Sequence, residues 1–168
     1  MTRRKFLLGS AGTLAALAAG GTVLRDMLAA PARAAEGEFE ISKTPEEWRS
    51  ILTKEQFAVL REEATERAFT SPLNDEKRAG LYHCAGCDLP LYSSETKFDS
   101  GTGWPSFYEA LPNAIGTKED KSFFMTRTEC HCRRCGGHQG HIFDDGPPPT
   151  GKRHCINGVA LKFVPEAA

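Results

Sequence analysis

The pattern of apolar and polar positions changes at about residue 80, from helix-forming to strand-forming. Before that point, Thr44 and Thr53 each stand where a helix N-cap is expected. Glu47 and Gln56, three residues after them, complete two capping boxes. Apolar residues then recur with helical spacing to about Glu63. We therefore predict two short helices in immediate succession.

After a loop-like segment at 70–79, short apolar or aromatic runs alternate with turn residues. The runs are LYHCAGC, DLPLYSS, GWPSFYEAL, SFFMTRTECHC, HIFDD and NGVALKFV. Runs of this length, separated by Gly, Pro, Asn and Asp, are typical of short antiparallel strands. A stiff loop at 146–151, GPPPTG, precedes the last part of this region. The chain from residue 80 is therefore predicted to be mainly β.

Residues 1–34 have the composition of a removable export signal. They begin with a paired arginine and a moderately apolar stretch interrupted by glycines, and they end in Ala32-Arg33-Ala34. The arginine pair resembles a twin-arginine signal, and the small residues offer a cleavage site. An uncleaved membrane anchor is the alternative, but the glycines and the cleavage site favour removal. We expect a tether at 35–43, one domain at 44–168 and a periplasmic protein that meets the membrane only during export.

Charge and length narrow the possible partners. The chain has 168 residues and a formal net charge of −1. The first 34 residues carry five basic side chains and one acidic, a net of +4, so the remaining chain has a charge of −5. A mildly acidic domain of this size argues against nucleic acid as a partner.

Export in the folded state would also protect a thiol-bound metal from the oxidising compartment beyond the membrane.

Two CxxC pairs, Cys84/Cys87 and Cys132/Cys135, carry the strongest chemical signal. Two residues between the cysteines let both sulfurs reach one metal on a tight turn, and two such turns complete a tetrahedral zinc site. Since 44 residues separate Cys87 from Cys132, the two halves should come from separate hairpins. A site closed by four thiolates has no open position for substrate, so we expect one structural Zn²⁺.

Other readings of the CxxC pairs stay open at this point. A redox CxxC, two structural disulfides, or a mixed ligand set that uses His83 or His131 would also fit the composition. Glycines at 86 and at 136–137 suit the backbone turns of metal-binding loops, and no βαβ pattern accompanies the pairs. These features favour the zinc site.

Two cysteines, Cys130 and Cys155, remain outside the pairs. Arg153 and Asn157 lie two residues on either side of Cys155, so on a strand all three share one face. A guanidinium beside a thiol favours the thiolate, which is the nucleophilic form. Cys155 is therefore the candidate reactive cysteine.

Further polar groups precede this cysteine, and an aromatic loop lies upstream. His138, His141 and Asp145 offer acids and hydrogen-bonding groups. Each of these residues alone would be interpreted as a structural or surface residue, but together, near an unpaired thiol, they indicate a reactive site.

At 101–107, glycines beside a Trp-Pro pair predict a loop that presents the indole of Trp104, either to the core or as a wall for an apolar methyl group.

These motifs, in this order over residues 44–164, resemble the B-type methionine sulfoxide reductases, which reduce the R epimer of methionine sulfoxide. The resemblance rests on the two CxxC pairs, GWPSF, HxxGHxFDDGP and RxCxN. It implies a mainly β (α+β) fold, in which two antiparallel sheets form a small barrel-like domain with short N-terminal helices and a zinc site of four cysteines.

The resemblance also implies roles for individual residues. Cys155 would be the nucleophile and would end as a sulfenic acid, and Trp104 with Phe107 would hold the substrate's methyl group. A sulfoxide needs its oxygen protonated or strongly hydrogen-bonded before a thiolate attacks its sulfur. His141, with Asp145 through a water, is the expected acid. The remaining polar lining would be His138, Arg153 and Asn157.

This sequence departs from the common pattern at Thr102, where many relatives carry a cysteine that resolves the sulfenic acid. Cys130 is a possible replacement if its strand lies beside Cys155; otherwise an external thiol must act. We favour the external thiol, because Cys130 reads as a buried strand residue. A thioredoxin-like protein or another thiol would then donate the electrons.

The reductase reading competes with two others. A non-catalytic zinc-ribbon binding module would not need the thiol in RxCxN. A secreted disulfide scaffold or exported thiol–disulfide oxidoreductase would hold oxidised cysteines and no zinc. We expect a monomeric reductase whose substrates are oxidised proteins or peptides containing methionine-R-sulfoxide.

Overall fold

The computed structural model describes residues 39–122 and 125–167; the predicted signal peptide and residues 35–38 of the tether lie outside them. Helices α1 (Pro45–Ile51) and α2 (Lys54–Glu62) come first, and both predicted capping boxes are present. Glu63 ends α2 in a left-handed conformation. Neither helix is long and apolar enough to cross a membrane.

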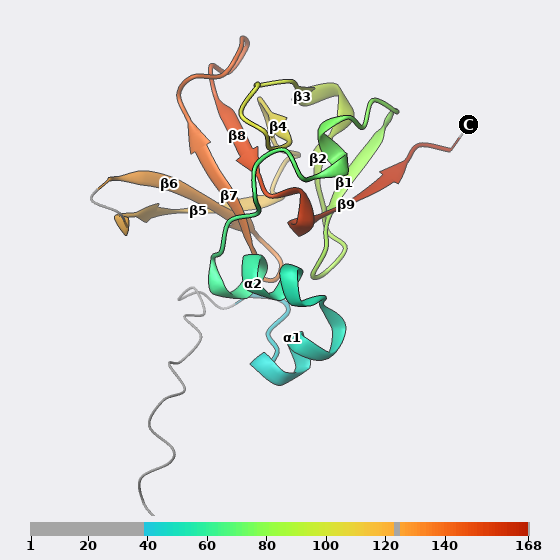
Figure 1. Ribbon diagram of the computed structural model, residues 1–168, viewed down its shortest axis with the longest axis vertical. Coiled ribbons are helices and arrows are strands. Elements are labelled where there is room, and N and C mark those ends of the chain that lie inside the picture. Colours follow the sequence, from blue (N-terminus) through green and yellow to red (C-terminus); the bar gives the residue numbers. More distant parts are fainter. Residues whose placement is uncertain (1–38, 123–124, 168) are drawn as a thin grey trace, which may run out of the picture. The chain divides into compact units, whose positions relative to one another are not determined.

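The rest of the described chain forms two antiparallel sheets, as expected (Figure 1). The small sheet has the order β2-β1-β9 and the large one β3-β4-β8-β7-β6-β5. The strands are β1 (Gly80–Cys84), β2 (Pro90–Ser93), β3 (Lys97–Phe98), β4 (Ser106–Phe107), β5 (Ile115–Asp120), β6 (Arg127–Cys132), β7 (His138–Phe143), β8 (Arg153–Ile156) and β9 (Leu161–Pro165). Short 3-10 turns are η1 (Pro72–Asn74), η2 (Ser94–Thr96) and η4 (Gly158–Ala160). Strands β3 and β5 were not predicted.

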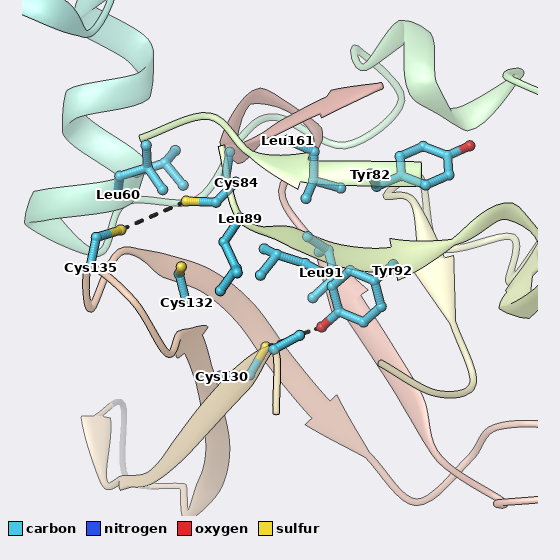
Figure 2. Close-up of a cluster of buried hydrophobic side chains, with 14 of the residues drawn as sticks. Leu60, Tyr82, Cys84, Leu89, Leu91, Tyr92, Cys130, Cys132, Cys135 and Leu161 are labelled. Carbon is cyan, nitrogen blue, oxygen red and sulfur yellow. Dashed lines mark hydrogen bonds between the residues drawn. The ribbon is translucent and has the colours of Figure 1, made fainter. Parts of the chain in front are cut away.

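An aromatic cluster joins the two sheets and corrects one prediction. Phe107 from β4 is fully buried, stacked on Tyr92 at 4.4 Å between ring centroids and edge-on to Tyr82 at 4.9 Å. Its ring therefore belongs to the core, and the expectation that Phe107 contacts substrate is wrong. Tyr92 is also in Figure 2, beside Leu91 and Cys130.

The register of the large sheet decides which residues share a face. Glu129 on β6, His141 on β7, Cys155 on β8 and Ser106 on β4 are successive cross-strand partners. Cross-strand partners point to the same side of a sheet, and sequence neighbours point to opposite sides. One row across four strands therefore brings the candidate nucleophile and a histidine to one face.

Candidate active site and metal centre

The four paired cysteines gather at one point, where β1 of the small sheet and β6 of the large sheet both end. Their sulfurs all lie within 4.8 Å of one another. The separations are 3.8 Å for Cys84–Cys135 and 3.4 Å for Cys87–Cys132. A tetrahedron of thiolates around one ion has edges of about 3.8 Å, whereas a disulfide bond is ~2.05 Å. The geometry fits a single metal ion that clips the two sheets together, and all six cysteines are free of disulfides.

The alternative with histidine ligands does not match this arrangement. The Nδ1 atom of His83 faces the carbonyl of Asp88 at 3.1 Å, and that of His131 faces the carboxylate of Glu129 at 2.9 Å. Among the described residues, the metal-binding group contains cysteines alone. Of the glycines expected at the turns, Gly136 alone has a positive φ angle, and Asp88 has the positive φ after the other CxxC pair.

Arg61 on α2 and Gln139 on β7 place hydrogen-bond donors around this metal-binding group. Arg61 stacks on Trp48, 4.4 Å from the ring centroid, and donates hydrogen bonds to the carbonyl of Cys135 at 3.0 and 3.1 Å. Its Nη2 also lies 3.6 Å from the Cys135 sulfur, and Nε2 of Gln139 lies 3.6 Å from the Cys84 sulfur. Donors around thiolates orient them and offset their charge. Hydrogen bonds from the other three cysteines lower the pKa of Cys135.

Cys155 is half-buried on the face described above, with a hydroxyl beside its sulfur. The Oγ1 atom of Thr102 lies 3.9 Å from the Cys155 sulfur. Ser100 links this hydroxyl at 2.8 Å to the buried hydroxyl of Ser106 at 2.7 Å. The position that lacks the resolving cysteine thus carries a hydrogen-bonding group at the reactive thiol.

Burial raises the pKa of the Cys155 thiol above its ordinary value. Thr102 and Arg153 act in the opposite direction by stabilising the thiolate, as the sequence suggested for Arg153, but burial outweighs them. The resting cysteine is therefore mainly a thiol at neutral pH. Its activation requires a group that removes the proton.

His141 is the candidate for this role. It is the direct cross-strand partner of Cys155, and its Nε2 faces the carboxylate of Asp120 at 2.8 Å. Arg127 donates to the same carboxylate at 2.6 Å. Burial lowers the pKa of His141, while the hydrogen bond to Asp120 raises it in part. The resting histidine is thus a neutral base oriented by a carboxylate.

His138 lies in a separate buried pair. Its Nδ1 faces the Glu129 carboxylate at 2.7 Å, and the two residues are 3% and 2% exposed. The rings of His138 and His141 are 5.5 Å apart between centroids. Burial would raise the pKa of Glu129, but hydrogen bonds from His131 and His138 lower it to about 2. A buried carboxylate therefore stays charged on the face that carries Cys155.

Two predicted residues have other partners than expected. Asp145 forms a bidentate pair with Arg153, 2.8 Å for each contact, and so aligns the guanidinium rather than His141. Strand β8 ends at Ile156, which leaves Asn157 beyond it. The Asn157 amide donates to the Gln139 carbonyl at 3.0 Å and accepts from the Glu66 N–H at 2.8 Å. Asn157 thus fastens the segment after α2 to β7.

The Trp104 loop is held by the same segment. The indole N–H of Trp104 donates to the Glu66 carbonyl at 2.9 Å, and the ring is neither fully buried nor exposed. Trp104 thus packs in a turn and keeps part of its ring accessible, and its role as a wall for a methyl group stays a prediction.

Cys130 is not placed to pair with Cys155. It is fully buried, its sulfur 4.0 Å from the Tyr92 hydroxyl, and burial raises its pKa (Figure 2). Cys130 and Ile156 flank Gly140 in one row, so Cys130 faces away from Cys155. Strand β7 lies between β6 and β8, which are therefore roughly 10 Å apart, whereas a disulfide needs Cα atoms within about 7 Å. This arrangement argues against a direct disulfide between Cys130 and Cys155.

The sequence analysis missed Asp120 and Glu129. It also missed Ser100 and Ser106, whose hydroxyls are hydrogen-bonded in series to that of Thr102. Asp120 lies on β5, which was not predicted. Glu129 lies on β6, whose sequence was interpreted mainly through its cysteines. An acidic residue inside the run RTECHC was an available signal, because buried carboxylates in strands require partners. Asp120 offered no comparable signal, because its partner histidine lies 21 residues later.

Comparison with known proteins decides the family. Residues 52–165 match the model of the SelR domain. The "Peptide methionine sulfoxide reductase MsrB" of Pseudomonas putida is 57% identical over 127 residues, 75% of this chain and 96% of the relative. The protein of the same name from Methanosarcina barkeri is 54% identical over 75% of this chain and 89% of its own length. The chain belongs to the MsrB family.

Family membership confirms the resemblance found in the four sequence motifs. A further MsrB relative, from Leifsonia xyli, is 53% identical over 79% of this chain and 97% of its own length. The MsrB match therefore spans the two sheets, the cysteine cluster and the face that carries Cys155. Among solved structures, the crystal structure of the Mis18 "Yippee-like" domain aligns with 54% of this chain at 14% identity and a TM-score of 0.45.

Proposed function

We propose that this MsrB protein reduces methionine-R-sulfoxide, in proteins or free, to methionine by nucleophilic attack of Cys155. The observation that carries the proposal is the pairing across β7 and β8. A half-buried thiol and a carboxylate-oriented neutral histidine are direct partners on one face, with Arg153 beside them. We take His141 as the activating base because a nucleophile of this kind needs a base on the same face of the site.

The reaction balances without an outside proton. His141 takes the thiol proton, and the resulting imidazolium gives it to the sulfoxide oxygen. The Cys155 thiolate attacks the sulfoxide sulfur, and the protonated oxygen passes from that sulfur to Cys155, which is oxidised to a sulfenic acid. The sulfoxide sulfur loses the oxygen and leaves as the reduced thioether of methionine. Arg153 and Thr102 stabilise the sulfur anion while it forms, and the Trp104 ring offers an apolar surface to the methyl group.

An external thiol donor completes the cycle. Attack of a first thiol on the sulfenic acid releases water and forms a mixed disulfide; a second thiol frees Cys155 and leaves the donor oxidised. The placement of Cys130 on the opposite face supports this route. A thioredoxin-like protein or a small thiol fits the requirement.

Cys84, Cys87, Cys132 and Cys135 would hold one structural Zn²⁺. Zinc bound by four thiolates supplies folding free energy rather than chemistry. The cysteine cluster lies where β1 and β6 end, so the ion would fix the position of the sheet that carries Cys155.

Residues 1–34, we further propose, are a twin-arginine-type signal that directs the domain at 44–168 to the periplasm and is removed before Ala35. The support is the sequence itself: the arginine pair, the glycine-interrupted apolar stretch and the Ala-Arg-Ala site.

The test of the mechanism is a single turnover without reductant. The protein is mixed with one equivalent of methionine-R-sulfoxide, and its peptides are analysed by mass spectrometry. We expect one oxygen atom gained on Cys155, trapped by a sulfenic-acid reagent, and no cysteine disulfide. A Cys155→Ser variant serves as the matched control and should gain nothing. A disulfide between Cys130 and Cys155 would refute the external-thiol route.

A further inference from the structure

Phe69 combines an exposed aromatic side chain with a left-handed backbone conformation. Its side chain is 73% exposed, more than any other large apolar residue of the described chain that faces solvent. Its φ angle is +64°, in the left-handed region that bulky residues rarely adopt. Neither burial nor backbone preference therefore explains an aromatic ring at this position. Strained residues that the surrounding structure holds in place concentrate at functional sites.

The strained backbone is tied to the loop that reaches Cys155. The Phe69 N–H donates to the Gly103 carbonyl at 2.7 Å, and the Asn74 amide donates to the same oxygen at 3.1 Å. A Cβ atom on Gly103 would lie 2.8 Å from the Phe69 ring. The ring therefore rests on Gly103 and leaves no room there for a side chain.

Gly103 stands between Thr102 and Trp104 in the loop. Thr102 places its hydroxyl 3.9 Å from the Cys155 sulfur. Trp104 is fastened through its indole to the Glu66 carbonyl, three residues before Phe69. An exposed aromatic ring thus borders the site next to the residues that would meet the methionine side chain.

We propose that Phe69 is a docking residue for peptide substrates, which contacts an apolar side chain next to the methionine sulfoxide. The proposal rests on the proposed function of the site and deepens it: the preferred substrate would be a peptide segment with an apolar residue next to the methionine sulfoxide. Phe69 packs on Gly103, the neighbour of Thr102, whose hydroxyl lies at the Cys155 sulfur. Since successive residues of an extended peptide are ~3.3 Å apart, we assign the Phe69 ring to a side chain one or two positions from the sulfoxide.

The test compares Phe69→Asn with the unchanged protein. Asparagine tolerates a left-handed backbone, so the substitution removes the ring and keeps the turn. Phe69→Tyr keeps the aromatic surface, and Ile51→Ser removes an exposed apolar residue on α1 instead. The substrates are N-acetylmethionine-R-sulfoxide and a short peptide with leucine beside the sulfoxide.

We expect Phe69→Asn to lower kcat/KM for the peptide about tenfold, equivalent to ~1.4 kcal/mol, and to leave the small substrate unchanged. Phe69→Tyr and Ile51→Ser should match the unchanged protein on both. Equal losses on both substrates would mean that Phe69 merely supports the Trp104 loop, and no loss on the peptide would equally overturn the proposal.

A binding measurement separates this inference from the reaction. In a Cys155→Ser background the peptide is not consumed, so its Kd can be measured by calorimetry. We expect Phe69→Asn to raise that Kd about tenfold. If the unchanged protein reduces neither substrate but this difference in Kd persists, the proposed reaction fails and the docking role stands. Equal Kd values would remove the docking role whatever the turnover.

Discussion

Single residues set the chemistry of the face that carries Cys155, and their effects oppose one another. Burial raises the pKa of the Cys155 thiol and lowers that of His141, so both are uncharged at rest. Charged neighbours partly reverse each shift: Arg153 stabilises the thiolate, and Asp120 stabilises the imidazolium. In the proposed reaction the thiol proton passes through His141 to the substrate. The two opposed pKa shifts therefore predict two pH effects.

Replacing Arg153 with glutamine should raise the pKa of Cys155 further, because a cation that favours the thiolate is lost. The rate of alkylation by iodoacetamide follows the thiolate, so its midpoint should lie above the ordinary cysteine value and move higher still in the variant. Arg78→Gln, at an exposed pair with Glu76, is the control. An unchanged or lower midpoint would argue against the role given to Arg153.

Replacing Asp120 with asparagine should extend activity to lower pH. Asp120 raises the pKa of His141, so its loss lets burial lower that pKa further. The reaction needs neutral His141, which is lost as pH falls through that pKa. The acid limb of kcat/KM should therefore shift to lower pH, with a reduced maximal rate because the ring loses its orienting partner. A shift to higher pH would contradict this assignment.

At the scale of elements, the metal-binding group joins the ends of strands from both sheets. The four cysteines lie where β1 and β6 end, and α2 closes over them through Arg61. A metal here adds stability only in the folded state, since the unfolded chain lacks the preformed site.

Metal removal should therefore loosen the whole domain. The protein is expected to contain one zinc per chain by elemental analysis. Chelation, or Cys132→Ser, should lower the Tm by well over ten degrees, as the loss of roughly 3 kcal/mol or more implies for a domain of this size. Cys130→Ala, beside the site but not a ligand, controls for loss of core packing. A metal-free protein with the same Tm would exclude a structural role.

Local signals explain which elements were predictable. The caps at Thr44 and Thr53 follow from contacts within four residues, and the CxxC pairs carry their own geometry. Phe107 was misassigned because its burial depends on Tyr82 and Tyr92 from the other sheet. The partners of Asp145 and His141 likewise depend on which strands pair, and a polar strand such as β5 has no apolar alternation to reveal it.

At the scale of the whole molecule, the leader and the domain are predicted to separate. The mature protein should begin at Ala35 in the periplasmic fraction, as intact-mass measurement would show. Replacing Arg3 and Arg4 together with lysine should retain the uncleaved chain inside the cell, because the arginine pair is the proposed export signal. Periplasmic protein that still carries residues 1–34 would indicate an anchor instead.

The central claim is that this MsrB protein reduces one epimer of methionine sulfoxide through Cys155. The most direct measurement is turnover of the separated R and S epimers, with a thiol donor, by the unchanged protein and by Cys155→Ser. We predict turnover of the R epimer alone and its complete loss in the variant, with zinc content and Tm unchanged. Equal turnover of both epimers, or activity that survives in Cys155→Ser, would contradict the account.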